Sequence, residues 1–235
     1  MNRVVITTAS RTSQQAECAL GLGRSLRFLG DETTRVIATD MPDRSWQPAF
    51  DQVWPSLDIP KLLEELGADQ ALILPPASLA FKRVGPVFEY CAGRGACSQT
   101  NIPGGPWLVY CEKGGDPTEP GKMPAIPDPT EPGKMPAIPA ETDFFSATTG
   151  MVGRLELDIV QNRCAFVCKR PYYRFVQPFI FCAAGAESSP YYVDQLESLA
   201  LLERYEQKHG FGYMSPLHKF TRSIHKRILR AKGRL

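Results

Sequence analysis

Val4-Val5-Ile6-Thr7-Thr8-Ala9, near the start of the chain, joins a short apolar run to small and hydroxyl-bearing residues. This pattern is typical of a buried strand that ends at the edge of a sheet. A helical pattern follows, for which Thr12 or Ser13 can provide the N-cap and Gly30 the stop. Its apolar positions are Ala16, Ala19, Leu20, Leu26 and Leu29. The chain therefore opens with a strand and an amphipathic helix.

The same alternation continues through residue 74. Further strands are expected at residues 35–39, 52–54 and 71–74, and a helix at residues 61–66 with Gly67 as its stop. Apolar strands that alternate with helices predict parallel strands covered by helices on both faces. We therefore expect an α/β fold built on an open, mixed but mainly parallel sheet.

In sheets of this kind, ligands bind beyond the carboxyl ends of the strands. The residues expected there are Thr7, Thr8, Ala9, Asp40, Pro75, Pro76, Ala77 and Ser78. Small residues leave room for a planar base, and the Asp40 carboxylate can accept a hydrogen bond from a ribose hydroxyl or a base imide. The alternative is that the threonines and Asp40 only cap turns. The dinucleotide motif G-x-G-x-x-G is missing, because Gly21 and Gly23 lie inside the helical pattern and position 26 is Leu.

The second half of the chain changes period. Residues 155–159 alternate apolar and acidic positions, and residues 165–168 are the expected return strand of a hairpin. An apolar strand is expected at residues 178–182 and a helix at residues 191–207. The final segment, residues 215–235, combines an apolar stripe with seven basic residues and no acid, which predicts a basic amphipathic helix.

Between these halves lies an exact tandem repeat. Residues 116–127 have the sequence DPTEPGKMPAIP, and residues 128–139 repeat it without a change. Four prolines in each copy remove backbone donors and disfavour both helix and sheet. We interpret the repeat as an exposed Pro-rich loop.

Composition narrows the class of protein. The net charge of +2 over 235 residues does not favour nucleic-acid binding by the whole chain. Seven cysteines without C-x-x-C spacing indicate reduced, buried thiols, and with the lack of a signal-peptide pattern they predict a cytoplasmic protein. The three histidines (His209, His218 and His225) lie far from the predicted strand ends, and no G-x-S-x-G motif supports a hydrolase.

Several stretches resemble one enzyme family. Residues 5–9, 19–30, 36–40 and 50–54 are similar to the opening of GT-A-type nucleotide-diphospho-sugar glycosyltransferases, of the bacterial glycogenin and galactosyltransferase group. The resemblance resumes at residues 71–93 and 155–205 and covers about two thirds of the chain. It implies a Rossmann-like GT-A sheet that binds a nucleotide sugar, with Lys61 placed where the family often has a lysine.

The chain departs from the family pattern at the metal site. The family carries Asp-x-Asp after its third main strand, where the carboxylates hold Mn²⁺ or Mg²⁺ beneath the sugar diphosphate. This chain has Pro75-Pro76-Ala77 followed by Ser78, and it has Cys182 where the family commonly has a metal-binding histidine. A thiolate is too soft a ligand for Mg²⁺. The acceptor-binding segment also has no clear equivalent. We therefore expect the metal ligands to be absent.

These features lead to two hypotheses. The first is a glycosyltransferase homologue that binds a nucleotide-diphospho-sugar through Thr7, Thr8, Ala9, Asp40 and Lys61, with metal-dependent transfer lost or replaced by basic side chains such as Lys82, Arg83 and Arg94. The second is a non-enzymatic scaffold on the same degenerate fold. In either case the basic segment from Leu217 to Leu235 can bind an anionic membrane surface or pack on the domain.

We accordingly divide the chain into four parts. Residues 1–112 form a nucleotide-binding α/β half, and residues 113–141 a Pro-rich tandem-repeat loop. Residues 142–210 supply a hairpin, a strand and a helix to the same domain, and residues 211–235 a basic amphipathic helix.

Overall fold

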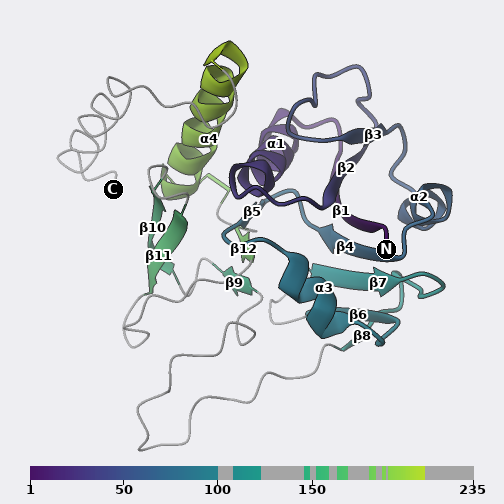
Figure 1. Ribbon diagram of the computed structural model, residues 1–235. Helices are drawn as coiled ribbons and strands as arrows, with labels where there is room; N and C mark the ends of the chain where they lie inside the picture. The colour runs from purple at the N-terminus through teal and green to yellow at the C-terminus, as the bar shows by residue number, and fades with distance from the viewer. Residues whose placement is uncertain are drawn as a thin grey trace, which may run out of the picture.

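The structure of the protein is a computed structural model that describes eight stretches of the chain. They are residues 1–99, 108–122, 146–148, 152–158, 163–168, 180–183, 187–188 and 190–209. Within them the main feature is a seven-stranded sheet with the strand order β3-β2-β1-β4-β7-β6-β8 (Figure 1). The predicted C-terminal helix and most of the tandem repeat lie outside the described residues.

The first four strands of this sheet are parallel. The central strand β1 (Arg3–Ala9) lies between β2 (Thr34–Thr39) and β4 (Gln70–Leu74), and β2 also pairs with the edge strand β3 (Gln52–Trp54). Since all four run the same way, Ala9, Thr39 and Leu74 end at one edge of the sheet. The predicted parallel core is confirmed.

The other strands make the sheet mixed. Strand β7 (Leu108–Glu112) is antiparallel to β4, and β6 (Ala96–Gln99) is antiparallel to β7. The two-residue strand β8 (Gly121–Lys122) runs parallel to β6. Strand β8 lies inside the first copy of the tandem repeat, at the first two residues after Pro120. The repeat therefore contributes a short pairing that a pure loop interpretation misses.

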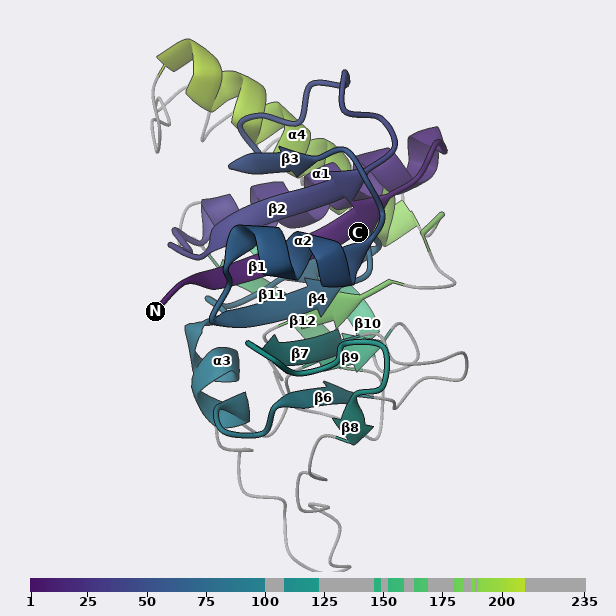
Figure 2. The ribbon, with the colours of Figure 1, turned by 90° about the vertical axis from the view of Figure 1, so that its right-hand side faces the viewer.

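Helices cover both faces of the sheet, as expected. Helix α1 (Ser13–Phe28) and α3 (Gly85–Cys91) pack on one face, where Leu22, Leu26 and Phe88 join Val5 and Leu72 in one core cluster. Helix α2 (Ile59–Leu66) packs on the other face through a second cluster. Figure 2 shows α2 on the near side of the strands and α1 on the far side.

The helix ends follow the predicted signals. The Thr12 hydroxyl oxygen accepts a hydrogen bond from the Gln15 N–H at 3.3 Å, which caps the start of α1. Gly30 and Gly67 follow α1 and α2 with φ of +64° and +55°, a backbone conformation that glycine adopts without a steric penalty.

Three further groups of elements complete the described fold. Strand β12 (Ile180–Cys182) lies between β5 (Ser78–Ala80), to which it is antiparallel, and β9 (Ser146–Thr148), to which it is parallel. Strands β10 (Val152–Asp158) and β11 (Arg163–Cys168) form the predicted antiparallel hairpin.

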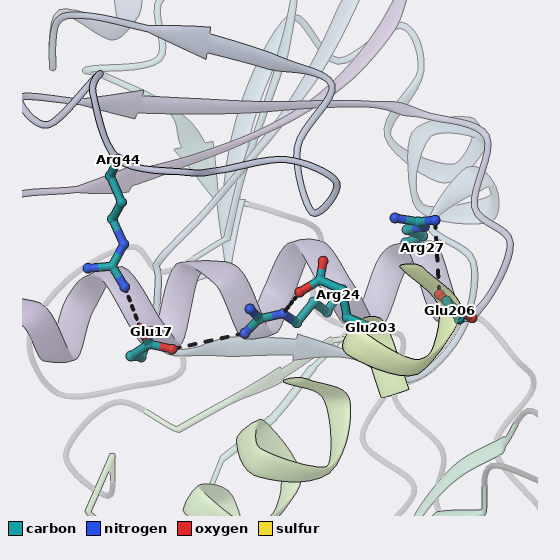
Figure 3. Close-up of polar contacts among 6 residues, drawn as sticks. All are labelled: Glu17, Arg24, Arg27, Arg44, Glu203 and Glu206. Atoms are coloured by element: carbon teal, nitrogen blue, oxygen red, sulfur yellow. Dashed lines mark hydrogen bonds and ion pairs between the residues drawn. The ribbon is translucent and has the colours of Figure 1, made fainter. Parts of the chain in front are cut away.

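Helix α4 (Pro190–His209) packs along α1 (Figure 3). Its buried side chains include Tyr192, Leu199 and Leu202. The helix approaches closely, because a Cβ on Gly21 of α1 would overlap the Leu196 side chain. No helix in the described part of the chain is long and apolar enough to cross a membrane.

Candidate functional site

A cavity of about 440 Å³ opens at the carboxyl edge of the parallel strands. Its wall comes from three places in the chain: the start of α1, the corner between β4 and β5, and the turn before α4. The lining residues are Thr12, Gln14, Gln15, Cys18, Pro75, Pro76, Ala77 and Glu187. The cavity therefore lies at the edge where a parallel α/β sheet binds its ligands. We call it the carboxyl-edge cavity.

The entry to α1 is fixed by local hydrogen bonds. The Gln15 side-chain oxygen accepts from the Ser10 N–H at 3.2 Å and from the Ser10 hydroxyl at 2.5 Å. With the Thr12 cap, these contacts hold the first turn of α1 against the end of β1. The polar side chains of that turn consequently have a defined place at the mouth of the cavity.

Thr7, Thr8 and Ala9 lie beside the cavity but not in its lining. The Thr7 hydroxyl is fully buried and donates to the Leu74 carbonyl oxygen at 2.8 Å, which ties β1 to β4. Ala9 is fully buried, and its carbonyl oxygen accepts from the Thr39 hydroxyl at 2.7 Å. The hydroxyl of Thr7 therefore links β1 to β4.

Asp40 and Lys61 also lie outside the lining. The Asp40 carboxylate is exposed and lies 3.8 Å from the Arg11 guanidinium. Lys61 belongs to α2, on the opposite face of the sheet from α1, and pairs with Glu65 at 3.9 Å. Ion pairs as exposed as these contribute little to stability. Asp40 therefore lies close to Arg11, next to the start of α1, whereas Lys61 lies on the other face of the sheet.

The corner at residues 75–78 is where the structure and the predicted site agree best. Pro75, Pro76 and Ala77 line the carboxyl-edge cavity. Ser78 is fully buried, and its hydroxyl has no hydrogen-bond partner among the described residues. Ser78 of β5 lies opposite Cys182 of β12 in the antiparallel pair that these strands form. The two segments that the resemblance associates with the metal are therefore neighbours in space.

The residues of this corner do not fit a hard divalent cation. Mg²⁺ and similar ions need several oxygen ligands, mostly carboxylates and waters. Proline and alanine side chains offer none, and Glu187 is the one carboxylate in the cavity lining. Within the described residues no group of three or more His, Cys, Asp or Glu side chains could hold a metal ion.

The basic side chains proposed to replace a metal have other contacts. Arg83 donates to the Leu29 carbonyl oxygen at 3.1 Å and lines a different cavity, of about 390 Å³, at the amino edge of the sheet. Arg94 stacks over the Tyr90 ring at 5.3 Å and donates to the Tyr90 carbonyl oxygen. Lys82 is half-buried. None of the three lines the carboxyl-edge cavity.

Sequence reasoning missed five lining residues: Gln14, Gln15, Cys18, Glu187 and Thr12, which was expected only as a helix cap. Burial raises the pKa of the Cys18 thiol, and the nearby Glu187 and Glu17 carboxylates raise it further, against a hydrogen bond to Tyr192. The thiol is therefore a neutral part of the wall. The available signals were the polar first turn of the helix and the position of Glu187 just beyond a strand end.

Comparison with known proteins gives structural matches alone. No protein-family model matches the chain, and no curated protein matches it. Among solved structures it is similar to the apo form of the glycosyltransferase GlyE of Streptococcus pneumoniae TIGR4, with 12% identity over 48% of this chain and a TM-score of 0.33. It is also similar to the galactosyltransferase LgtC in complex with donor and acceptor sugar analogues, with 10% identity over 46% of this chain and a TM-score of 0.31.

The chain spans 34% of the length of GlyE and 57% of the length of LgtC. A third match, the bifunctional glycosyltransferase WbbM, has 10% identity, a TM-score of 0.30 and coverage of 42% of this chain and 23% of that one. These three solved structures are glycosyltransferases.

Proposed function

We propose that this protein binds a nucleotide-diphospho-sugar in the carboxyl-edge cavity and does not carry out metal-dependent sugar transfer. The observation behind the proposal is the lining of that cavity. It combines hydrogen-bonding side chains at the start of α1 with an apolar wall at Pro75, Pro76 and Ala77, and its described residues offer no donor set for a metal.

The cavity suits the binding of a small polar molecule. Its volume lies within the range of about 300–1,000 Å³ that is typical of ligand pockets. The Thr12 hydroxyl and the side-chain amides of Gln14 and Gln15 can bond ribose or sugar hydroxyls and base edges. The two prolines and Ala77 offer a flat apolar surface against which a base can lie.

Loss of the metal donors removes a specific part of sugar transfer. In metal-dependent transfer the cation neutralises the departing diphosphate and stabilises the charge that develops on it. The Pro75–Ala77 wall supplies no oxygen ligand, and none of the basic candidates lines the cavity. Binding without transfer is therefore the function that the lining supports best.

The proposal is tested by the melting temperature of the full chain against a panel of nucleotide-diphospho-sugars, with and without Mn²⁺. A ligand at 100 times its Kd stabilises the folded state by about 2.7 kcal/mol. At about 2–4 °C per kcal/mol for a chain of this size, the melting temperature rises by about 5–10 °C. We expect one nucleotide to give this shift whether or not Mn²⁺ is present. Gln14→Trp, which fills the cavity from an exposed position, should abolish the shift.

The scaffold hypothesis makes the opposite prediction. It is favoured by two features of the sequence, the tandem repeat at residues 116–139 and the basic segment from Leu217 to Leu235. A scaffold needs no nucleotide, so no member of the panel would shift the melting temperature.

For the basic segment we propose contact with the anionic, cytoplasmic face of a membrane. Deletion of residues 216–235 should abolish sedimentation of the protein with anionic vesicles. Unchanged sedimentation after the deletion would refute the membrane contact.

A further inference from the structure

The wall of the carboxyl-edge cavity has an unusual charge for a nucleotide site. Of its eight lining residues, seven are neutral and one, Glu187, carries a carboxylate. The Cys18 thiol belongs to the neutral group, because burial and the adjacent Glu187 and Glu17 carboxylates raise its pKa. Among the residues that the structure describes, no lysine or arginine lines the cavity. A ligand that enters it therefore meets a weakly negative field.

The cations of the surrounding elements pair with acids elsewhere. Arg24 of α1 forms ion pairs with Glu203 of α4 and with Glu17, and Arg44 also pairs with Glu17. Figure 3 shows the Arg24 and Glu203 side chains meeting across the α1–α4 contact, with Glu17 between Arg24 and Arg44. Arg24 and Glu203 are 14% and 10% exposed, so turning Arg24 toward a ligand would leave a nearly buried carboxylate without its partner.

Two other cations near the start and the end of α1 are also engaged. Arg11 lies 3.8 Å from the Asp40 carboxylate, and Arg27 lies 4.0 Å from that of Glu206. Within the described part of the chain, the remaining attraction for an anion is the N-terminus of α1, which carries about half of a unit charge. The Thr12 hydroxyl already accepts one of the N–H groups of that first turn. This partial charge is smaller than the full charge on Glu187.

From this arrangement we infer that the carboxyl-edge cavity binds the uncharged nucleoside part of its ligand and disfavours the diphosphate. The inference rests on the proposed function, because it takes the nucleotide as the ligand. Neutral donors and acceptors on Thr12, Gln14 and Gln15 bond the ribose and the base edge, while Pro75 and Pro76 cover one base face. The diphosphate is left at the mouth of the cavity, where the Glu187 carboxylate repels it.

The consequence is that this cavity should bind a nucleoside more tightly than the corresponding nucleoside diphosphate, the reverse of the usual order. A site that holds the diphosphate through a metal or basic residues binds a nucleoside diphosphate more tightly than the nucleoside. Here a diphosphate with two or three negative charges faces the Glu187 carboxylate. At a separation of about 6 Å and an effective dielectric constant of about 40, each pair of charges weakens binding about tenfold. We therefore expect the nucleoside to bind at least tenfold more tightly than its diphosphate at low salt.

The experiment is calorimetric titration of the full chain with adenosine, cytidine, guanosine and uridine, each beside its 5′-diphosphate, without added metal. Each pair is measured at ionic strengths of about 0.01 M and about 0.5 M, because screening shortens the reach of charges from about 30 Å to a few ångströms. The variant is Glu187→Gln. Its matched control is Glu197→Gln, which removes the same charge from an exposed position ten residues further along the chain.

The expected result has three parts. One nucleoside binds at least tenfold more tightly than its diphosphate at low salt, and this ratio of the two Kd values (the gap) becomes smaller at high salt. Glu187→Gln reduces the ratio at least threefold and changes the Kd of the nucleoside less than twofold. Glu197→Gln leaves the ratio as in the wild type.

Tighter binding of the diphosphate by the wild type would overturn the inference and leave the proposed function standing. An equal gap in the two variants would also overturn the inference, since Glu187 would then not be its cause. Failure of every nucleoside and every diphosphate to bind would refute the proposed function, and the inference with it.

Discussion

Replacing Gly23 by alanine should destabilise this protein, although the same change usually stabilises a helix. Gly23 lies in the interior of α1, where alanine is normally favoured by about 0.5–1 kcal/mol. A Cβ at this position would lie 2.6 Å from the Ala49 carbonyl oxygen and 3.0 Å from its carbonyl carbon. Both atoms belong to the backbone, so a side-chain rotation cannot relieve the overlap.

The size of the effect follows from what surrounds Ala49. Ala49 is fully buried, and its neighbours Trp46 and Phe50 are 1% and 2% exposed and belong to the same core cluster as Ala16 and Ala19 of α1. Overpacking in such a core costs about 1–3 kcal/mol. The gain in helix propensity offsets up to about 1 kcal/mol of that cost. The expected net loss is about 1–2 kcal/mol, or a fall in melting temperature of about 3–6 °C.

The measurement is urea unfolding of Gly23→Ala beside Gly85→Ala. Gly85 begins α3, and a Cβ added there has no neighbour within 4 Å, so its free energy of unfolding should change by less than about 0.5 kcal/mol. A Gly23→Ala variant as stable as the wild type, or more stable, would refute the close contact between α1 and the segment that contains Ala49.

Three further predictions concern polar contacts. Glu203→Leu removes the main partner of the nearly buried Arg24 guanidinium and should lower the free energy of unfolding by about 3 kcal/mol. The double variant Arg24→Met/Glu203→Leu should recover at least half of that loss. Equal losses in the single and double variants would contradict this. Thr7→Val removes a buried hydrogen bond and should lower the free energy of unfolding by about 1 kcal/mol without a change in nucleotide affinity. A loss of nucleotide affinity with unchanged stability would instead make the Thr7 hydroxyl a ligand contact. The hydrogen bond from the Gly93 N–H lowers the pKa of the Glu112 carboxyl, and smaller contributions come from the Tyr110 hydroxyl and the Gly95 N–H. The ionised carboxylate therefore stabilises the fold fully above the ordinary glutamate pKa of about 4.3, and this stabilisation is lost as the pH falls through the lowered pKa. The difference in unfolding free energy between the wild type and Glu112→Gln, measured by urea unfolding, should therefore shrink as the pH falls below about 5, and a difference independent of pH would contradict the assignment.

The parallel core of the fold could be predicted because its signals are local. Strands β1, β2 and β4 are continuous apolar runs, and Thr12, Gly30 and Gly67 stand at the helix ends where caps and stops are needed. Such signals do not depend on the rest of the chain. The hairpin of β10 and β11 was predictable for the same reason, from its period of two.

The other strands of the main sheet depend on distant partners. Strand β6 has only four residues, with Cys97 and Ser98 at its centre, and gains its conformation from pairing with β7. Strand β7 pairs in turn with β4, from which it is separated by β5, α3 and β6. Strand β8 has two residues in a proline-rich segment. No periodicity in these short segments indicates that they extend the sheet.

The candidate site was predictable in part for a similar reason. Pro75, Pro76 and Ala77 follow an apolar strand directly, so topology alone places them at the carboxyl edge. Glu187 reaches the same cavity because α4 packs along α1, which the sequence does not encode locally. Thr7 also stands at the expected edge, but its hydroxyl turns to the Leu74 carbonyl oxygen. The position of a residue in a predicted strand indicates where its backbone lies, but tertiary contacts determine the direction of its side chain.

The central claim is that a nucleotide binds in the carboxyl-edge cavity without a metal. Its most direct test is the amide NMR spectrum of the full chain during titration with the best-binding nucleotide of the panel, before and after addition of Mn²⁺. If the nucleotide binds there without a metal, the amide signals of Gln14, Gln15 and Ala77 shift, and those of Thr33 and Thr34 in the amino-edge cavity do not. Addition of Mn²⁺ then causes no paramagnetic broadening of the Ala77 and Glu187 signals. Shifts confined to Thr33 and Thr34, or strong broadening at Ala77 and Glu187, would contradict it.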